Sequence, residues 1–194
     1  MLACGALARE LLAITSQPGL DHVHVECLPA ELHNRPDRIP AAVEARLDAV
    51  AGSYDEIILG YADCGTGGLL DALCERRGIV RLPGAHCYEL FAGRATFAAL
   101  HEAELGTFYL TDYLARHFDR LIVQGLGLDR HPELADMYFG HYTRLIHLAQ
   151  LDDPALAVKA EAAAKRLGLR FESMSTGYGE LASSVVELAG AGAR

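Results

Sequence analysis

The chain has 194 residues, of which 51% are hydrophobic and 22% charged, a balance typical of a folded globular protein. Its 26 acidic residues outnumber its 17 lysines and arginines, so the formal net charge is -9 at pH 7. This charge disfavours nucleic-acid binding and docking on anionic lipid, because both depend on basic residues. There is no apolar run long enough to span a bilayer and no signal-peptide pattern, so we expect a cytoplasmic protein.

Short apolar runs alternate with segments of helical spacing along the whole chain. The predicted strands are, in order, 2–5, 23–28, 56–61, 79–82, 107–110, 144–148 and 169–174. The predicted helices cover about 7–14, 39–50, 69–73, 86–100, 112–123, 154–167 and 181–188. This alternation predicts an α/β fold over residues 1–194 as a single domain. We expect a mostly parallel open sheet with helices on both faces, a Rossmann- or flavodoxin-like three-layer sandwich.

The helix expected after residue 153 has the clearest boundaries in the sequence. Asp153 is placed to accept hydrogen bonds at its start, and Pro154 fits the first turn. Gly168 fits the position just past its end, where a left-handed backbone is common. These signals predict both ends of this helix.

The composition includes five cysteines and nine histidines, and their positions are informative. In a reducing cytoplasm the thiols stay free, and an odd number does not suit a disulfide framework. Cys4 ends the first predicted strand, Cys64 follows the third and Cys87 follows the fourth, whereas His33 lies in the loop after the second. With the common strand order 2-1-3-4-5, these side chains meet at the carboxyl edge of one sheet. Thiolates with an imidazole favour zinc, or alternatively an iron–sulfur cluster.

Two roles remain open for the residues around this edge. His86 could replace His33 as the fourth ligand or act as a proton donor, and Cys64 could instead be a metal-free nucleophile. Cys27 and Cys74 are expected to fill the core, because free cysteine is among the most buried residue types. The remaining histidines, His147 among them, are expected to be solvated or partly buried.

A glycine-rich turn follows the third strand. Gly65, Thr66 and Gly67 could present backbone N–H groups to an anionic cofactor at the start of the next helix. The turn lacks the Lys-Ser/Thr ending of a P-loop and the spacing of a dinucleotide fingerprint.

Several motifs together resemble an uncharacterised family, the domain of unknown function 1638. They are Ala3-Cys4-Gly5, Leu32-His33 with Pro36, Gly60-Tyr61 with Cys64-Gly65, His86-Cys87, 106–111 and 142–150. Members occur in bacteria and methanogenic archaea, often beside corrinoid-dependent methyltransferase systems. The resemblance therefore implies a role around one-carbon transfer.

Two features depart from that context. The chain begins only three residues before Cys4, so its first strand is shorter than expected for the family; either the start is misassigned or the strand is trimmed. The corrinoid-binding signature DxHxxG is also absent, because Leu134 stands where its glycine is needed after Asp129 and His131.

We therefore expect a zinc-binding protein of methyl-group metabolism with ligands Cys4, Cys64, Cys87 and either His33 or His86. The metal could activate a thiol or another small polar substrate, with Cys64 and His86 as the catalytic candidates. Two alternatives remain: a non-catalytic accessory or metal-delivery protein for a methyltransferase system, and a metal-free cysteine enzyme. The partner is a small-molecule substrate or a methyltransferase-system protein, and the sequence leaves catalysis and oligomeric state open.

Overall fold

The computed structural model describes residues 1–191, which divide into two compact units. Unit 1 comprises residues 1–90 and 180–191, and unit 2 comprises residues 91–179. Each unit contains its own parallel sheet. The expectation of one domain over residues 1–194 stays a prediction, because two contact units can belong to one domain or to two.

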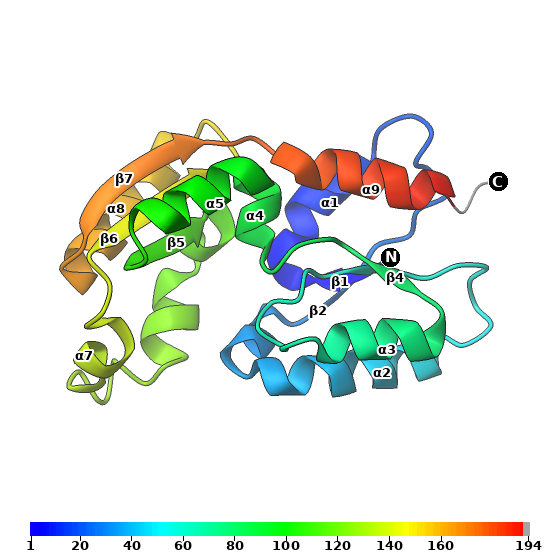
Figure 1. Cartoon of the computed structure of the whole chain (residues 1–194), viewed down its shortest axis with the longest axis horizontal. Helices are drawn as coiled ribbons and strands as arrows, with labels where there is room; N and C mark the ends of the chain where they lie inside the picture. The colour runs from blue at the N-terminus through cyan, green and yellow to red at the C-terminus, as the bar shows by residue number, and fades with distance from the viewer. Residues whose placement is uncertain (192–194) are drawn as a thin grey trace. The chain divides into compact units, whose positions relative to one another are not determined.

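Unit 1 is built on a four-stranded sheet of order β2-β1-β3-β4, in which every pair is parallel. Its strands are β1 (Leu2–Cys4), β2 (Glu26–Leu28), β3 (Ile58–Gly60) and β4 (Val80–Arg81). Its helices are α1 (Ala8–Thr15), α2 (Ile39–Ala49), α3 (Leu69–Arg77), α4 (Cys87–Ala92, which continues past the unit boundary) and α9 (Gly179–Ala191). Figure 1 shows α1 and α9 on one face of this sheet and α2 and α3 on the other. Short 3-10 turns at Gly5–Leu7, Ala30–Asn34 and Pro36–Arg38 complete the unit.

Unit 2 contains a three-stranded parallel sheet of order β5-β6-β7. Its strands are β5 (Thr107–Thr111), β6 (Arg144–Ala149) and β7 (Arg170–Ser175). Its helices are α5 (Arg94–Ala103), α6 (Asp112–Arg116), a π-helix (Asp119–Gln124), α7 (Leu134–Phe139) and α8 (Pro154–Leu167).

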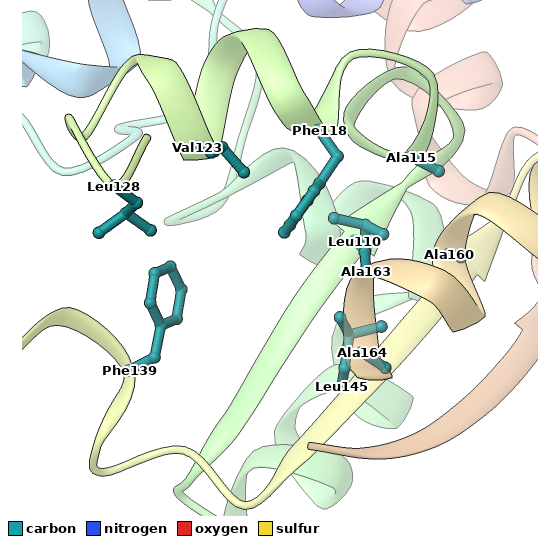
Figure 2. Close-up of a cluster of buried hydrophobic side chains, with 10 residues drawn as sticks. All are labelled: Leu110, Ala115, Phe118, Val123, Leu128, Phe139, Leu145, Ala160, Ala163 and Ala164. Atoms are coloured by element: carbon teal, nitrogen blue, oxygen red, sulfur yellow. The ribbon is translucent and has the colours of Figure 1, made fainter. Parts of the chain in front are cut away.

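The two faces of this second sheet are covered by different helices. On one face, Leu110 and Leu145 pack against the alanine-rich side of α8 and the segment after β5, as Figure 2 shows. On the other face, Arg144 donates to the carbonyl of Leu100 in α5 at 3.1 Å. Since neighbouring residues of a strand point to opposite faces, Arg144 and Leu145 place α5 and α8 on opposite sides.

The predicted fold class is confirmed: parallel strands form open sheets with helices on both faces. The strand order is confirmed for the first four strands, but the fifth pairs with β6 in a separate sheet. The single helix expected over 86–100 is two helices, because Gly93 adopts a φ of 80° between them. The boundaries of α8 are as predicted, with the Asp153 side chain accepting from Ala155 N and Gly168 at a φ of 71°.

Within residues 1–191, no helix has both the length and the apolar character needed to cross a membrane.

Candidate functional site

The carboxyl edge of the unit 1 sheet brings three sequence-predicted residues toward one place. Cys4 is the last residue of β1, which lies between β2 and β3. Two backbone hydrogen bonds join the segment after β3 to the segment after β4. Asp63 N donates to Gly84 O at 3.1 Å, and Cys64 N donates to Ala85 O at 2.8 Å. Cys87 begins α4 two residues later. Backbone hydrogen bonds thus hold Cys64 beside the turn that leads to Cys87.

His33 approaches Cys4 from the 3-10 turn after β2. Its ring nitrogens lie 3.7 Å (Nδ1) and 4.0 Å (Nε2) from Cys4 Sγ. Nδ1 is also 3.2 Å from the carbonyl oxygen of Ala30. Because a carbonyl oxygen only accepts, this contact places the ring hydrogen on Nδ1 and leaves the Nε2 lone pair available. Ligating histidines are commonly oriented by such a carbonyl.

The three thiols lie close enough to influence one another electrostatically. Burial raises the pKa of Cys4 to about 12 and that of Cys64 to about 11, and it raises the pKa of Cys87 well above its ordinary value. A negative charge on Cys64 raises the pKa of both other thiols further. We call Cys4, His33, Cys64 and Cys87 the thiol cluster. In the absence of a cation its cysteines are neutral thiols at pH 7.

Two histidines were predicted as alternatives for the fourth position, and both are near. Burial lowers the pKa of His33, and the neighbouring His86 lowers it further, so the His33 imidazole is neutral at pH 7. His86 is only partly buried, and its ring contacts Tyr88 at a centroid distance of 6.1 Å. His33 contacts the Cys4 thiol of the cluster.

Tyr61, which the sequence places at the end of a strand and in a family motif, is a residue of this site for which no role was predicted. Its side chain is fully buried, and its ring stacks on His33 with centroids 6.1 Å apart. Its hydroxyl has no hydrogen-bond partner among residues 1–191. Burial raises the pKa of Tyr61, and so do the charges of Cys4 and Cys64, so the hydroxyl keeps its proton. A polar side chain ending the most apolar strand was the signal available in the sequence.

Local backbone geometry at the cluster is unusual at two residues. Cys64 has a φ of 52°, the one non-glycine residue with positive φ among residues 1–191. Such a conformation is costly and is concentrated at functional sites. Gly60 is constrained by its neighbour and not by its φ: a Cβ there would lie 2.5 Å from the Ala3 Cβ. A glycine at this position lets β3 approach β1 and brings Tyr61 close to Cys4.

The glycine turn after Cys64 is closed by its own carboxylate. Asp63 accepts from Thr66 Oγ1 at 2.7 Å, from Gly68 N at 2.9 Å and from Gly67 N at 3.1 Å. Although burial opposes the shift, these hydrogen bonds lower the pKa of Asp63, so the carboxylate is charged at pH 7. Asp63 thus occupies the hydroxyl of Thr66 and the N–H of Gly67, and the role of Gly65, Thr66 and Gly67 in holding an anionic cofactor stays a prediction.

The side chains of the cluster are not arranged as a ready metal site. Among residues 1–191, no group of three or more His, Cys, Asp or Glu side chains is positioned to hold a metal ion. Binding at the predicted ligands therefore requires side-chain rotation around the Cys4–His33 contact. All five cysteines are free; Cys74 is buried as predicted, whereas Cys27 is only half-buried.

A second buried polar group lies in unit 2 and was not expected. His147, thought to be solvated or partly buried, is 1% exposed, and its Nε2 lies 2.9 Å from Asp112 Oδ1. Asp112 Oδ2 accepts from Leu151 N at 2.9 Å, and the Asp112 N–H donates to Gln150 Oε1 at 2.8 Å. We call Asp112, His147 and Gln150 the His147 network. Asp112 lies 35 residues from His147 and 38 residues from Gln150 along the chain, so their contact leaves no local pattern in the sequence.

Comparison with known proteins finds one relationship. No curated protein and no solved structure has a significant match to the chain. A family model described as a protein of unknown function (DUF1638) matches residues 27–185, a range that includes His33, Tyr61, Cys64 and Cys87. Because this match covers most of the chain, the protein belongs to the DUF1638 family.

Proposed function

We propose that the thiol cluster binds a soft divalent metal ion, zinc first, through Cys4, Cys64, Cys87 and His33. The contact between Cys4 and His33 carries the proposal. In a tetrahedral zinc site with Zn–S of about 2.3 Å and Zn–N of about 2.1 Å, the sulfur and nitrogen ligands lie about 3.6 Å apart. His33 Nε2, the nitrogen whose lone pair is available, lies 4.0 Å from Cys4 Sγ, so a small movement of either side chain brings the two atoms to this separation.

The protonation of the cluster favours a metal over a metal-free nucleophile. A cysteine nucleophile must be a thiolate, and burial holds Cys4 and Cys64 with pKa values of about 12 and 11. Neutral His33 cannot supply the missing positive charge at pH 7. A divalent cation supplies it, because metal binding displaces protons from thiols. The buried Tyr61 hydroxyl also lacks a partner within the described part of the chain, which is expected where a ligand is needed to complete a polar site.

The role of the metal depends on how many positions the protein fills. Three protein ligands leave one position vacant, where a substrate thiol or another small polar group is deprotonated or polarised, with Cys64 and His86 as candidate catalytic residues. Four protein ligands favour an accessory or metal-delivery role. A place in methyl-group metabolism rests on the family resemblance, and methyltransferase-system proteins are the partners it implies.

Metal analysis of anaerobically purified protein tests this proposal. We expect about one zinc per chain in the unaltered protein and far less in Cys4→Ser, Cys64→Ser and Cys87→Ser. Cys74→Ala is the matched control, because Cys74 lies in the same unit on α3, outside the cluster. His33→Ala and His86→Ala identify the fourth ligand, and we expect the larger loss of zinc from His33→Ala.

Finding iron in place of zinc, together with an absorption spectrum that indicates bound sulfide, would support the iron–sulfur alternative. A protein that contains neither metal and takes up none on titration contradicts the proposal. In that outcome, fast alkylation of a single cluster thiol at neutral pH supports the metal-free enzyme.

A further inference from the structure

Unit 2 contains a cavity whose charge is opposite to that of the protein as a whole. The cavity has a volume of about 480 Å³ and lies between α8 and the segment from α6 through the π-helix. Its lining includes Arg116, Arg120, Lys159 and Arg166, but only one acidic residue, Asp119. In a chain of net charge -9, this concentration of cations marks a local positive region.

The cations stand on two facing walls. On α8, Lys159 and Arg166 are seven residues apart and therefore share one side of the helix, with Ala162 and Ala163 lining the space between them. On the opposite wall, Arg116 and Arg120 are four residues apart. Buried Phe118 and Ala163 contribute an apolar floor. Small alanines leave room between cations that long side chains would otherwise fill.

The wall that carries Arg120 has an unusual backbone. Asp119–Gln124 forms a π-helix, in which Gly125 N donates to Arg120 O, five residues earlier, at 3.0 Å. Turns of this type are rare and occur frequently at functional sites. The wider turn is an independent indication that this wall is shaped for more than packing.

One contact inside the cavity shows that its cations bind a carboxylate. Arg166 Nη1 donates to the carboxylate of Asp119 at 2.8 Å, across the two walls. The side chains of this pair are 51% and 76% exposed, and an exposed pair of this kind contributes little to stability. The carboxylate is therefore a weak internal occupant that an incoming anion displaces at low cost.

We propose that this cavity binds a phosphorylated small molecule. Arginines hold phosphate oxygens through paired N–H groups, and Lys159 adds a mobile point charge. The volume lies in the range of small-ligand sites, and the apolar floor accommodates the organic part of the ligand. The site lies within unit 2 and shares no residue with the thiol cluster, so it stands or falls independently of the metal proposal.

Titration calorimetry on the full chain at 150 mM salt tests the proposal, with pyrophosphate and ADP as probes and adenosine as the phosphate-free control. We expect at least one phosphate probe to bind with a Kd below about 1 mM, and adenosine to bind much more weakly. Binding of neither probe, or binding of adenosine as tightly as ADP, overturns the proposal.

Three variants locate the site. Lys159→Ala should weaken binding about tenfold, the effect of one lost charge-assisted contact. Lys165→Ala is the matched control: it removes the same charge from the same helix, but Lys165 does not line the cavity, so affinity should change less than about twofold. Asp119→Asn should tighten binding about threefold, because it removes the internal competitor of Arg166. Equal weakening by both lysine variants, or weaker binding by Asp119→Asn, contradicts this location.

Discussion

The thiol cluster of unit 1 and the His147 network of unit 2 are polar groups at the carboxyl ends of parallel strands, but their hydrogen bonding differs. The His147 network is fully buried, whereas the thiol cluster is buried at Cys4 and half-buried at its other members. In the His147 network, Asp112 accepts from His147 and from the backbone of Leu151. The side-chain amide of Gln150 accepts from Asp112 N and donates to Leu148 O. Beside the thiol cluster, the Tyr61 hydroxyl has no partner among residues 1–191; within the cluster, Cys4 Sγ accepts from Ala6 N at 3.2 Å and contacts the His33 ring at 3.7 Å.

This difference separates a structural network from a site. Buried polar groups that satisfy one another stabilise one conformation and have no capacity left for a ligand. Groups that are buried but unsatisfied are costly unless something from outside the chain completes them. We therefore interpret the His147 network as a structural element of unit 2 and the thiol cluster as the candidate site.

The largest effect is expected from breaking the satisfied network. Asp112→Ala removes the acceptor of buried His147 Nε2 and of the part-buried Leu151 N–H, so both donors lose this partner. The free energy of unfolding should fall by about 2–5 kcal/mol, as measured by urea unfolding. Asp136→Ala, at an exposed position of α7, is the control and should change stability by less than about 0.5 kcal/mol. Similar stabilities for the two variants would show that the His147 network is not a structural element of unit 2.

The next largest effect concerns the strand contact beneath the thiol cluster. In Gly60→Ala the new methyl group meets the Ala3 Cβ at 2.5 Å and must push β3 away from β1. We expect a loss of about 1–3 kcal/mol in urea unfolding, the usual cost of overpacking. Gly190→Ala, in α9 of the same unit, meets no atom of residues 1–191 within 4 Å and should be neutral or stabilising by up to about 1 kcal/mol. A neutral Gly60→Ala would show that the two strands have room to separate.

The fold class could be predicted from the sequence because helices and strands are marked by local signals. Asp153, Pro154 and Gly168 mark the ends of α8 by side-chain and backbone chemistry that acts within a few residues. The strand Thr107–Thr111 was also recognised, but its neighbour was not. Whether it joins β4 or β6 depends on tertiary contacts, since a β-branched run fits either sheet.

The site was partly predictable for the same reason. Cys4, Cys64 and Cys87 each follow a strand of one parallel sheet, so topology alone places them at one edge. Three features had no such signal. The hydrogen bonds from Asp63 close the glycine turn, the side chain of Tyr61 turns into the core, and His147 meets an aspartate 35 residues away. Each depends on side-chain directions that only the folded chain determines.

A pH titration of the metal-free protein tests the burial of the thiols. Cys4 has a pKa of about 12 in the folded chain against an ordinary value of 9.0, so the folded state holds this proton more tightly than the unfolded state. Its stabilising contribution is complete below pH 9 and is lost as the pH rises toward 12; at pH 10 the loss is about 1–2 kcal/mol for this one thiol.

Urea unfolding at pH 8 and pH 10, in the presence of a chelator, measures this loss. Cys4→Ser should show a smaller fall in stability between the two pH values, because a serine hydroxyl does not titrate there. An equal fall in both proteins would indicate that Cys4 is solvated and would weaken the contrast between the cluster and its surroundings.

The smallest effect has the opposite sign and is the most direct test of the comparison. Tyr61→Phe removes a buried hydroxyl that has no partner among the residues the structure describes, so the metal-free protein should gain about 1 kcal/mol in urea unfolding. Tyrosine-to-phenylalanine changes normally destabilise when the hydroxyl is hydrogen-bonded, so a loss of stability would show that the hydroxyl is satisfied in solution. If zinc content falls in the same variant while the metal-free form is more stable, the hydroxyl serves the ligand and not the fold. Stability and ligand binding then have opposing requirements at Tyr61, which is the behaviour expected of a functional site and not of a core residue.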